Sequence, residues 1–275
     1  MENYKNKKWL QEKFNTIGYK TDIAKLCGVS GDTIEYWRKK FNIPKRIMPS
    51  KNIRYKCDKN FFLDIDTEEK AYWLGFIMAD GYMNKEKTKF GIMLNVRDIA
   101  HLNKFNKTLN SNYPITTRTI EDKRGFTSTE CCIRINSKYM CETLIKNNVY
   151  PNKTGNEIIP DSIPYILKRH FIRGYFDGDG SISKISNSQY YRFGLGSCSK
   201  SIMDQISYFI LNTNGYSIKY YISNSYSKPF YYFSCNNHII VNDFLHTIYD
   251  NSTIFLNRKK EKANEMFTVC ARKNS

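Results

Sequence analysis

An internal duplication constrains this chain more than any other feature of its sequence. Two apolar segments, 72–82 and 171–181, each contain an Asp-Gly pair near their end, and the aspartates Asp80 and Asp179 lie 99 positions apart. A repeat of roughly one hundred residues is too long for one unit of a solenoid. The spacing therefore indicates a duplicated half-domain, with each copy beginning at an apolar helix that ends in Asp-Gly.

Each Asp-Gly segment is followed by the same order of expected elements. The apolar spacing predicts two strands, a helix, two more strands and another helix in both copies. The expected strands are 82–84, 90–96, 115–120, 128–136, 181–183, 190–196, 216–222 and 230–235, and the expected helices are 98–109, 138–147, 200–212, 238–249 and a last one from about 255. We predict an α+β fold of pseudo-two-fold αββαββα halves, about 67–160 and 161–275.

A small all-α domain is expected to precede this fold, over 1–48. Ile23, Ala24 and Leu26 supply apolar contacts on a helix that ends at Gly28, a residue free to adopt positive φ. Ser30 can then cap a helix over 31–41. The run 23–38 resembles a helix-turn-helix DNA-binding unit. The resemblance implies that the last helix presents the following residues to DNA: Gly31, Asp32, Thr33, Tyr36, Arg38, Lys39 and Lys40. A three-helix domain with a solvated basic face is the alternative.

A basic linker is predicted between the two domains, over 49–66. Its cationic residues and those just before it are Lys45, Arg46, Lys51, Arg54 and Lys56, and they show little periodicity before Phe61. Such a segment can follow a phosphate backbone.

The composition favours a polyanionic partner. The 275 residues include 43 Lys and Arg against 26 Asp and Glu, a formal net charge of +17, and 41% are hydrophobic, so a packed core is expected. Nucleic acid is the first candidate partner and an acidic membrane the second, while A+T-rich codon usage would give the same bias.

No apolar run is long enough to span a membrane. The eight Cys form no C-x-x-C pair and the first residues have no apolar export signal, which favours reduced thiols in a cytoplasmic protein. The expected setting is a bacterial or phage protein, or an organellar one.

Segments 73–81 and 172–180 resemble the LAGLIDADG motif of homing endonucleases. Two copies in one chain are similar to the two-motif, monomeric branch of that family, and the likeness extends over 67–275. The resemblance implies a sequence-specific endonuclease whose sheets form a saddle on double-stranded DNA. It further implies that both strands are cut across the minor groove, leaving short 3′ overhangs.

The small residues of the two motifs agree with this likeness. Gly75 and Ala79 lie four positions apart on one helical face, as do Gly174 and Gly178. Such faces allow two helices to approach backbone to backbone, which brings Asp80 and Asp179 together at their C-terminal ends. Two carboxylates at the negative ends of two helix dipoles repel each other unless a cation lies between them. As a single occurrence, either Asp-Gly pair would be no more than a helix-ending turn.

The resemblance also implies a metal cofactor and further site residues. Mg²⁺ is the expected ion, Mn²⁺ can replace it, and Ca²⁺ is expected to bind without supporting cleavage; backbone groups near Gly81 and Gly180 are further candidate ligands. The expected catalytic residues are Asp80, Asp179, Lys153 and Lys259, with ordinary phosphate contact or solvation as the alternative for both lysines. Asn95 and Ser197 are candidate supporting side chains. Asp177 aligns with Met78 and is therefore not expected to be a symmetric ligand.

A saddle over the major groove would carry Arg, Lys, Tyr and Asn side chains, which read base edges. The candidate DNA-binding residues of the two halves are Lys85, Lys87, Lys89, Arg118, Lys123, Arg124, Arg134, Tyr190, Tyr191, Arg192, Lys219, Tyr220 and Tyr221. Strand register decides which of them face DNA.

Three functions stay open. A double-strand DNA homing endonuclease, acting as a monomer, is the leading one. The others are a group I intron maturase, with RNA as partner, and a non-cleaving transcription regulator, since one bacterial regulator family joins a degenerate LAGLIDADG scaffold to a helix-turn-helix. Both motif aspartates are present, which favours cleavage. The sequence has no H-N-H cluster and no GIY/YIG pair.

Overall fold

A computed structural model of the chain describes residues 3–17, 19–43, 55–121, 125–224 and 228–272. The chain divides into two compact units, Met1–Arg54 and Tyr55–Ser275, and each has a hydrophobic core of its own. Among the described helices, none combines the length and apolar character needed to cross a membrane.

The first unit is a small helical bundle. Its elements are η1 (Asn3–Lys5), α1 (Lys7–Thr16), α2 (Lys20–Cys27) and α3 (Gly31–Lys40). Gly28 ends α2 with a φ of 69°, and the Ser30 hydroxyl accepts a hydrogen bond of 3.2 Å from the Thr33 N–H, as the sequence predicts. The prediction for Leu26 is wrong, because this side chain is 62% exposed and does not belong to the core.

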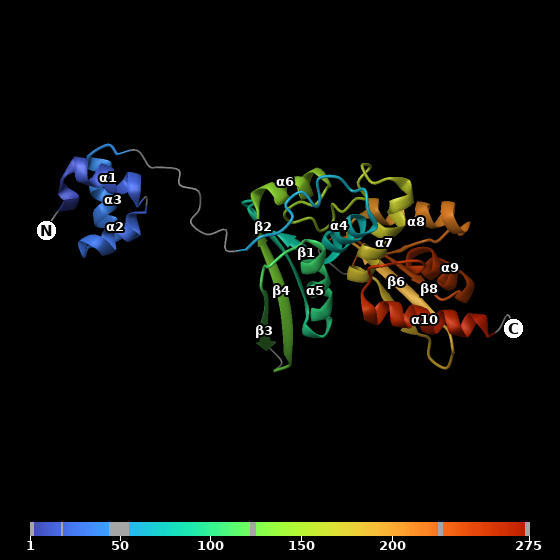
Figure 1. Cartoon of the computed structure of the whole chain (residues 1–275). Coiled ribbons are helices and arrows are strands. Elements are labelled where there is room, and N and C mark those ends of the chain that lie inside the picture. The colour runs from blue at the N-terminus through green and yellow to red at the C-terminus, as the bar shows by residue number, and fades with distance from the viewer. Residues whose placement is uncertain (1–2, 18, 44–54, 122–124, 225–227, 273–275) are drawn as a thin grey trace. The chain divides into compact units, whose positions relative to one another are not determined.

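The second unit contains two copies of one α+β arrangement. The first copy comprises α4 (Glu68–Asp80), β1 (Gly81–Met83), β2 (Lys89–Asn95), η2 (Val96–Asp98), α5 (Ile99–Thr108), β3 (Ile115–Glu121), β4 (Thr127–Asn136) and α6 (Lys138–Lys146). The second comprises α7 (Tyr165–Asp179), β5 (Ser181–Lys184), β6 (Tyr191–Ser197), α8 (Lys200–Asn214), β7 (Tyr221–Ser223), β8 (Phe230–Cys235), α9 (His238–Tyr249) and α10 (Asn257–Ala271). Figure 1 shows both copies and the central α4–α7 pair. The predicted α+β duplication is confirmed.

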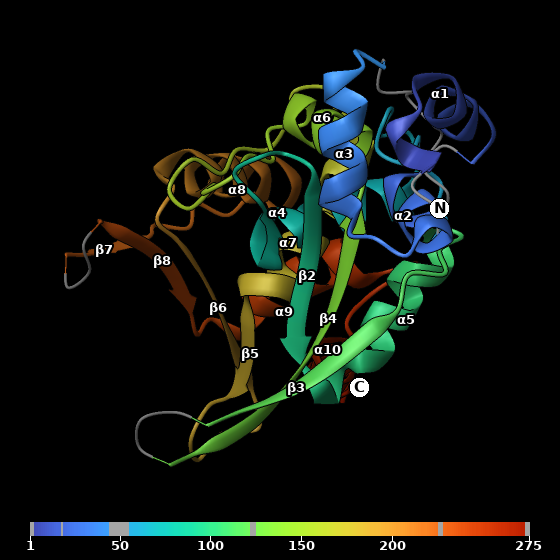
Figure 2. The same cartoon turned by 90° about the vertical axis from the view of Figure 1, so that its left-hand side faces the viewer.

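Two antiparallel sheets form the β part of this unit, in the orders β1-β2-β4-β3 and β5-β6-β8-β7. Alternation along each strand sends one set of side chains toward the helices, such as Ile92 and Ile133 in the first sheet and Phe193 and Phe233 in the second. In Figure 2 the β3–β4 and β7–β8 hairpins extend from the centre of the unit on the same side. The side chains that alternate with these core residues, such as Arg134 and Arg192, lie on the opposite face of their sheet.

Two sequence expectations need correction. The strand expected at 216–222 is restricted to β7, because the preceding residues bind helices instead of a neighbouring strand. The Tyr216 and Tyr220 hydroxyls donate hydrogen bonds to Asp243 and Asp204, and the Ile218 carbonyl accepts one from Ser207.

The predicted linker 49–66 is also too long. Phe61, Phe62 and Ile65 are buried in the core of the second unit, and the Asp58 N–H donates to the Leu109 carbonyl. The chain thus joins the second unit from Tyr55 onward, because this segment buries aromatic surface. Six of the basic residues named above lie outside the described residues: Lys45, Arg46, Lys51, Arg54, Lys123 and Arg124.

Candidate active site at the α4–α7 contact

The motif helices α4 and α7 touch backbone to backbone. A Cβ atom added to Gly75 would lie 2.0 Å from the Phe171 carbonyl oxygen, and one added to Gly174 would lie 1.9 Å from the Tyr72 carbonyl oxygen. Neither position can carry a side chain, because the obstructing atoms belong to the opposite backbone. The glycines therefore set the separation of the two helices.

The same contact continues to the C-terminal ends of both helices. A Cβ atom on Gly178 would lie 2.4 Å from the Ala79 Cβ and 3.4 Å from a carboxylate oxygen of Asp80. Since Asp179 follows Gly178 directly, the two motif carboxylates end side by side. Gly81 and Gly180 follow them, and a Cβ at either position would meet atoms of the preceding helical turn, at Ile77 or Phe176.

Both carboxylates lie in an environment that penalises their charge. Burial raises the pKa of Asp80, and the positive charges of Lys259 and Lys153 oppose this shift. Although Asp179 keeps exposed surface, the surrounding protein raises its pKa to about 6, and the neighbouring Asp80 charge adds to the increase. We conclude that Asp80 and Asp179 share one electrostatic site that favours an added cation.

Each motif helix is capped by a lysine of its own half. Lys153 Nζ donates to the Ala79 carbonyl of α4 at 2.7 Å, and Lys259 Nζ donates to the Phe176 and Asp177 carbonyls of α7 at 2.6 and 2.7 Å. These contacts satisfy the unpaired carbonyls of a helix end, where a cation is favoured. Burial lowers the pKa of Lys259 to about 8. Both ammonium groups thus hold the helix ends that carry the carboxylates.

Additional charged residues, which sequence reasoning missed, surround the pair. Arg258 Nε donates to the Asp98 carboxylate at 3.1 and 3.2 Å, and both charges act on Asp80. The buried Glu157 adjoins Asp179 and raises its pKa, and its side chain accepts a hydrogen bond from the Gly155 N–H. Asp98 and Arg258 lie in different halves of the duplication, so sequence spacing offers no sign of their pairing.

Asp177 is fully buried and forms the centre of a hydrogen-bonded cluster. Its carboxylate accepts hydrogen bonds from Tyr249 (2.5 Å), Tyr72 (2.8 Å) and the Leu256 N–H (2.8 Å). His101 Nε2 lies 3.0 Å from the Tyr72 hydroxyl, and burial lowers the pKa of this histidine to about 3, so it is neutral. The cluster fixes the start of α10, and through it Lys259. Asp177 is therefore a positioning residue and not a ligand.

A second buried contact crosses between the halves at the other end of α4. Arg173, 0% exposed, donates to Glu68 at 2.6 Å and to the Ile248 and Ile254 carbonyls. The Glu68 carboxylate also accepts a hydrogen bond of 2.8 Å from the Thr253 N–H. An arginine inside the apolar segment 171–181 is the sequence signal that could have predicted such a buried partner.

The carboxylate pair suits a hard divalent cation that shares its ligands with a substrate. Among the described residues, no group of three or more His, Cys, Asp or Glu side chains could hold a metal by itself. Mg²⁺, however, is commonly held by one or two carboxylates together with phosphate oxygens and water. Asp80 and Asp179, whose carboxylates lie beside each other at the helix ends, are the residues that would hold such an ion.

Asn95 and Ser197, the candidate supporting residues, have local structural roles. The Asn95 side chain accepts a hydrogen bond from the Arg97 N–H at 3.1 Å, and the Ser197 hydroxyl accepts one from the Ser199 N–H at 3.0 Å. Each residue thus stabilises the turn that follows the second strand of its half.

The outer face of the first sheet carries several of the expected DNA-binding residues. Arg118 pairs with Glu130 at 3.0 Å, and Arg134 Nε donates to the Tyr82 hydroxyl at 2.9 Å. Lys85 and Lys87 lie exposed in the β1–β2 turn. Both arginines are thus already oriented by partners within the protein.

The second sheet differs from the sequence expectation at Tyr191 and at Tyr220, whose hydroxyl donates to Asp204 of α8 and whose ring packs against the core. Tyr191 is 6% exposed, faces the core and donates a hydrogen bond to Glu265, so the prediction that it contacts DNA is wrong. Register explains the difference, because Arg192, its neighbour, takes the outer face and donates to Ser183 at 3.0 Å. Tyr221 and Lys219 are exposed.

In the first unit, Arg38 does not project freely from α3. Its guanidinium pairs with Glu35 at 2.9 Å and donates to the Ile43 carbonyl. These contacts bind the segment after α3 to the helix. This contradicts the expectation that Arg38 points toward DNA. Thr33 contacts the capping Ser30 hydroxyl at 3.0 Å, whereas Tyr36 and Lys39 are exposed.

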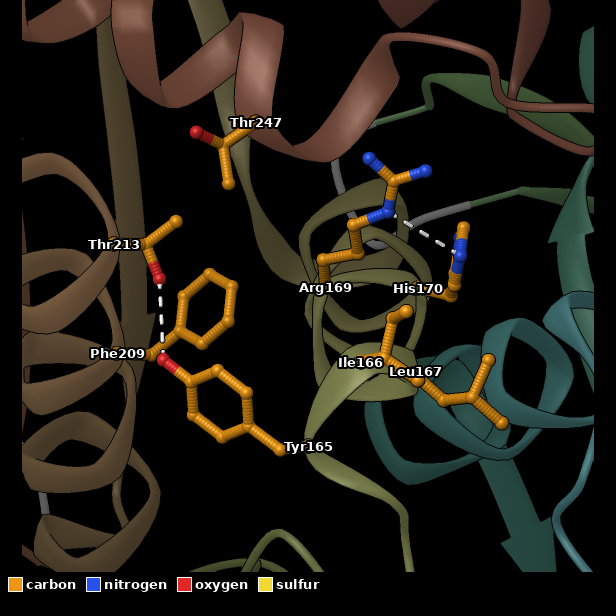
Figure 3. A pocket seen from close by; sticks show the side chains of 8 residues that line it. All are labelled: Tyr165, Ile166, Leu167, Arg169, His170, Phe209, Thr213 and Thr247. Carbon is orange, nitrogen blue, oxygen red and sulfur yellow. Dashed lines mark hydrogen bonds between the residues drawn. The ribbon is translucent and has the colours of Figure 1, made fainter.

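A hollow of about 770 Å³ lies at the N-terminal end of α7 (Figure 3). Its lining is mainly apolar, with Tyr165, Ile166 and Phe209 beside Arg169. Tyr165 and Asp179 are the two ends of a 15-residue helix, and therefore lie about 20 Å apart. This hollow is thus separate from the carboxylate pair.

Two family models match the second unit. Residues 69–129 match the WhiA LAGLIDADG-like domain, and residues 167–250 match the LAGLIDADG-like domain. One match falls in each half, and each includes a motif aspartate. The chain belongs to the LAGLIDADG family.

Solved structures share this fold. The homing endonuclease I-WcaI bound to its DNA recognition sequence is 12% identical, with a TM-score of 0.51, over 79% of this chain and 95% of that one. Full-length DUF199/WhiA from Thermatoga maritima is 16% identical, with a TM-score of 0.46, over 76% of this chain and 64% of that one.

Among curated proteins, a DNA polymerase of Acanthamoeba polyphaga mimivirus is 27% identical over 168 residues, which are 58% of this chain. The match spans 9% of the length of that polymerase.

Proposed function

We propose that this LAGLIDADG protein is a sequence-specific, double-strand DNA endonuclease. The observation that carries the proposal is the meeting of Asp80 and Asp179 at the C-terminal ends of two helices held in backbone contact by Gly75 and Gly174. A regulator that only binds DNA has no need of two carboxylates in a site where their charges repel. Family relatives of known structure include homing endonucleases bound to DNA.

Three sets of residues have different roles in the proposed cleavage: metal binding, positioning of the helix ends and DNA contact. Asp80 and Asp179 would hold Mg²⁺, and the bound ion would supply charge neutralisation and Lewis-acid polarisation at the phosphate. Lys153 and Lys259 keep the helix ends in place and add positive charge beside the phosphodiester. Arg118, Arg134 and Arg192 hold the duplex on the outer faces of the sheets.

The proposal is tested with the full chain, a randomised duplex library and Mg²⁺, followed by sequencing of the cut ends. Asp80→Asn and Asp179→Asn should each abolish double-strand cleavage and change the binding affinity by less than about tenfold, because the site is polar and the shape is kept. Asp161→Asn is the matched control, because this exposed carboxylate lies before the start of α7, at the opposite end of that helix from Asp179. Mg²⁺-dependent cutting by the Asp80→Asn, Asp179→Asn double variant would refute the assignment.

One finding favours a second function, that of a non-cleaving regulator. The first half matches the WhiA type of the domain, whose members are not enzymes. Under this alternative the chain selects a specific duplex from the library but leaves it intact with Mg²⁺ and with Mn²⁺. The N-terminal unit, with Tyr36 and Lys39 exposed on α3, is proposed as a second DNA contact under either function.

A further inference from the structure

The outer face of the second sheet contains a hollow directly beside Asp179. It has a volume of about 380 Å³ and extends over β5, β6 and β8. Its floor is formed by small residues, since Ser181, Gly194 and Gly196 line it together with Ser183 and Ser234. This hollow therefore lies next to the candidate active site, on the face where the proposed function puts DNA.

The corresponding place on the first sheet is filled by a tyrosine ring. Tyr82 pairs with Gly91, and a Cβ on Gly91 would lie 2.8 Å from the Tyr82 hydroxyl oxygen. In the second sheet the equivalent pair is Ser181 with Gly194. A Cβ on Gly194 would lie 2.9 Å from the Ser181 hydroxyl oxygen, so the serine also covers its glycine, but it has no ring to extend beyond it. Ser181 therefore lines the hollow at the position where the first sheet has the ring of Tyr82.

Aromatic rings form one wall of the hollow. Phe230 lies over Gly196, where a Cβ would approach its ring to 2.4 Å, and it stacks with Tyr232 at a centroid distance of 6.3 Å. Tyr221 continues the row, at 5.4 Å from Tyr232. The wall is thus apolar over most of its length.

Charge in the hollow is sparse and balanced. Among its described lining residues, Arg192 is the one cation and Asp179 the one carboxylate. The first sheet instead presents Arg118, Glu130 and Arg134 at its surface. The first face is therefore suited to polar base edges, while the second offers apolar contact and room.

We propose that the second sheet recognises thymine methyl groups in the half-site nearest to Asp179. The C5 methyl is the apolar group that a base pair presents in the major groove, and aromatic or small apolar side chains contact it. A hollow with a glycine and serine floor and an aromatic wall accepts such a methyl without a steric clash. This inference rests on the proposed DNA contact and adds the base class that one half selects.

The test uses wild-type protein and duplexes selected from the randomised library in Ca²⁺, so that binding is measured without cutting. Positions whose base preference changes in Arg118→Ala are assigned to the first half-site. In the other half-site, thymine is then replaced by deoxyuridine, which lacks only the methyl. We expect binding to weaken about fourfold per methyl group removed there, and to change by less than twofold for the same replacement in the first half-site.

Protein variants at Ser181 test the same contact by changing the hollow instead of the base. Ser181→Tyr should fill the hollow as Tyr82 does in the first half and abolish discrimination between thymine and deoxyuridine in the second half-site. Ser181→Ala keeps the hollow open and should retain the discrimination. Equal deoxyuridine effects in both half-sites, with binding intact, overturn this inference alone. Failure to select any duplex overturns the proposed function, and the inference with it.

Discussion

At the scale of single residues, the carboxylates Asp80 and Asp179 make the folded chain sensitive to pH. Folded Asp179 keeps its proton up to about pH 6, whereas an unfolded aspartate loses it near pH 4. The folded state binds more protons between these values, so its free energy of unfolding falls as pH rises through this window. We expect a loss of roughly 1 kcal/mol, because exposed surface on Asp179 screens part of the effect.

Replacing both aspartates by asparagine should remove this pH dependence. In EDTA at pH 7 the Asp80→Asn, Asp179→Asn variant should melt higher than wild type, since repulsion is relieved and shape is kept. Millimolar Mg²⁺ or Ca²⁺ should raise the wild-type melting temperature and leave the variant unchanged, with a monovalent salt as control for screening. Equal metal shifts in both proteins would mean that the carboxylates act separately.

At the scale of elements, the α4–α7 contact depends on its two central glycines. Gly174→Ala puts a methyl group 1.9 Å from the Tyr72 carbonyl, so one backbone must move. We expect the free energy of unfolding to drop by ~3 kcal/mol or more, measured in urea, with loss of the carboxylate geometry. Gly31→Ala is the control, because its methyl would lie 3.7 Å from the flexible Lys20 side chain. A Gly174→Ala protein as stable as wild type would show that the helices are not in backbone contact.

At the scale of the whole molecule, the two units should be separable. Residues 1–54 contain 13 Lys and Arg against 5 Asp and Glu, a high density of positive charge for so short a segment. A chain of 55–275 should fold with an unchanged melting temperature, because its core is its own. It should bind DNA more weakly, with a shorter footprint and a shallower salt dependence. An identical footprint and salt slope would mean that the first unit does not contact DNA.

Much of this protein followed from local sequence. The order of elements within each half and the capped helix α3 depend on neighbours within a few positions, and apart from the strand expected at 216–222 the structure has them where the sequence predicts. Both Asp-Gly pairs also mark their helix ends correctly. These features are local because apolar periodicity and turn residues act through the backbone of one segment.

The tertiary structure decided which polar groups meet. Strand register turned Tyr191 into the core and Arg192 outward, a choice of one residue that alternation alone leaves open. The pairing of Arg258 with Asp98 joins residues 160 positions apart. Likewise, the hollow beside Asp179 is lined by Ser181, at the position where the first half has Tyr82. Such contacts depend on how distant segments pack, and packing is a property of the whole fold and not of any segment.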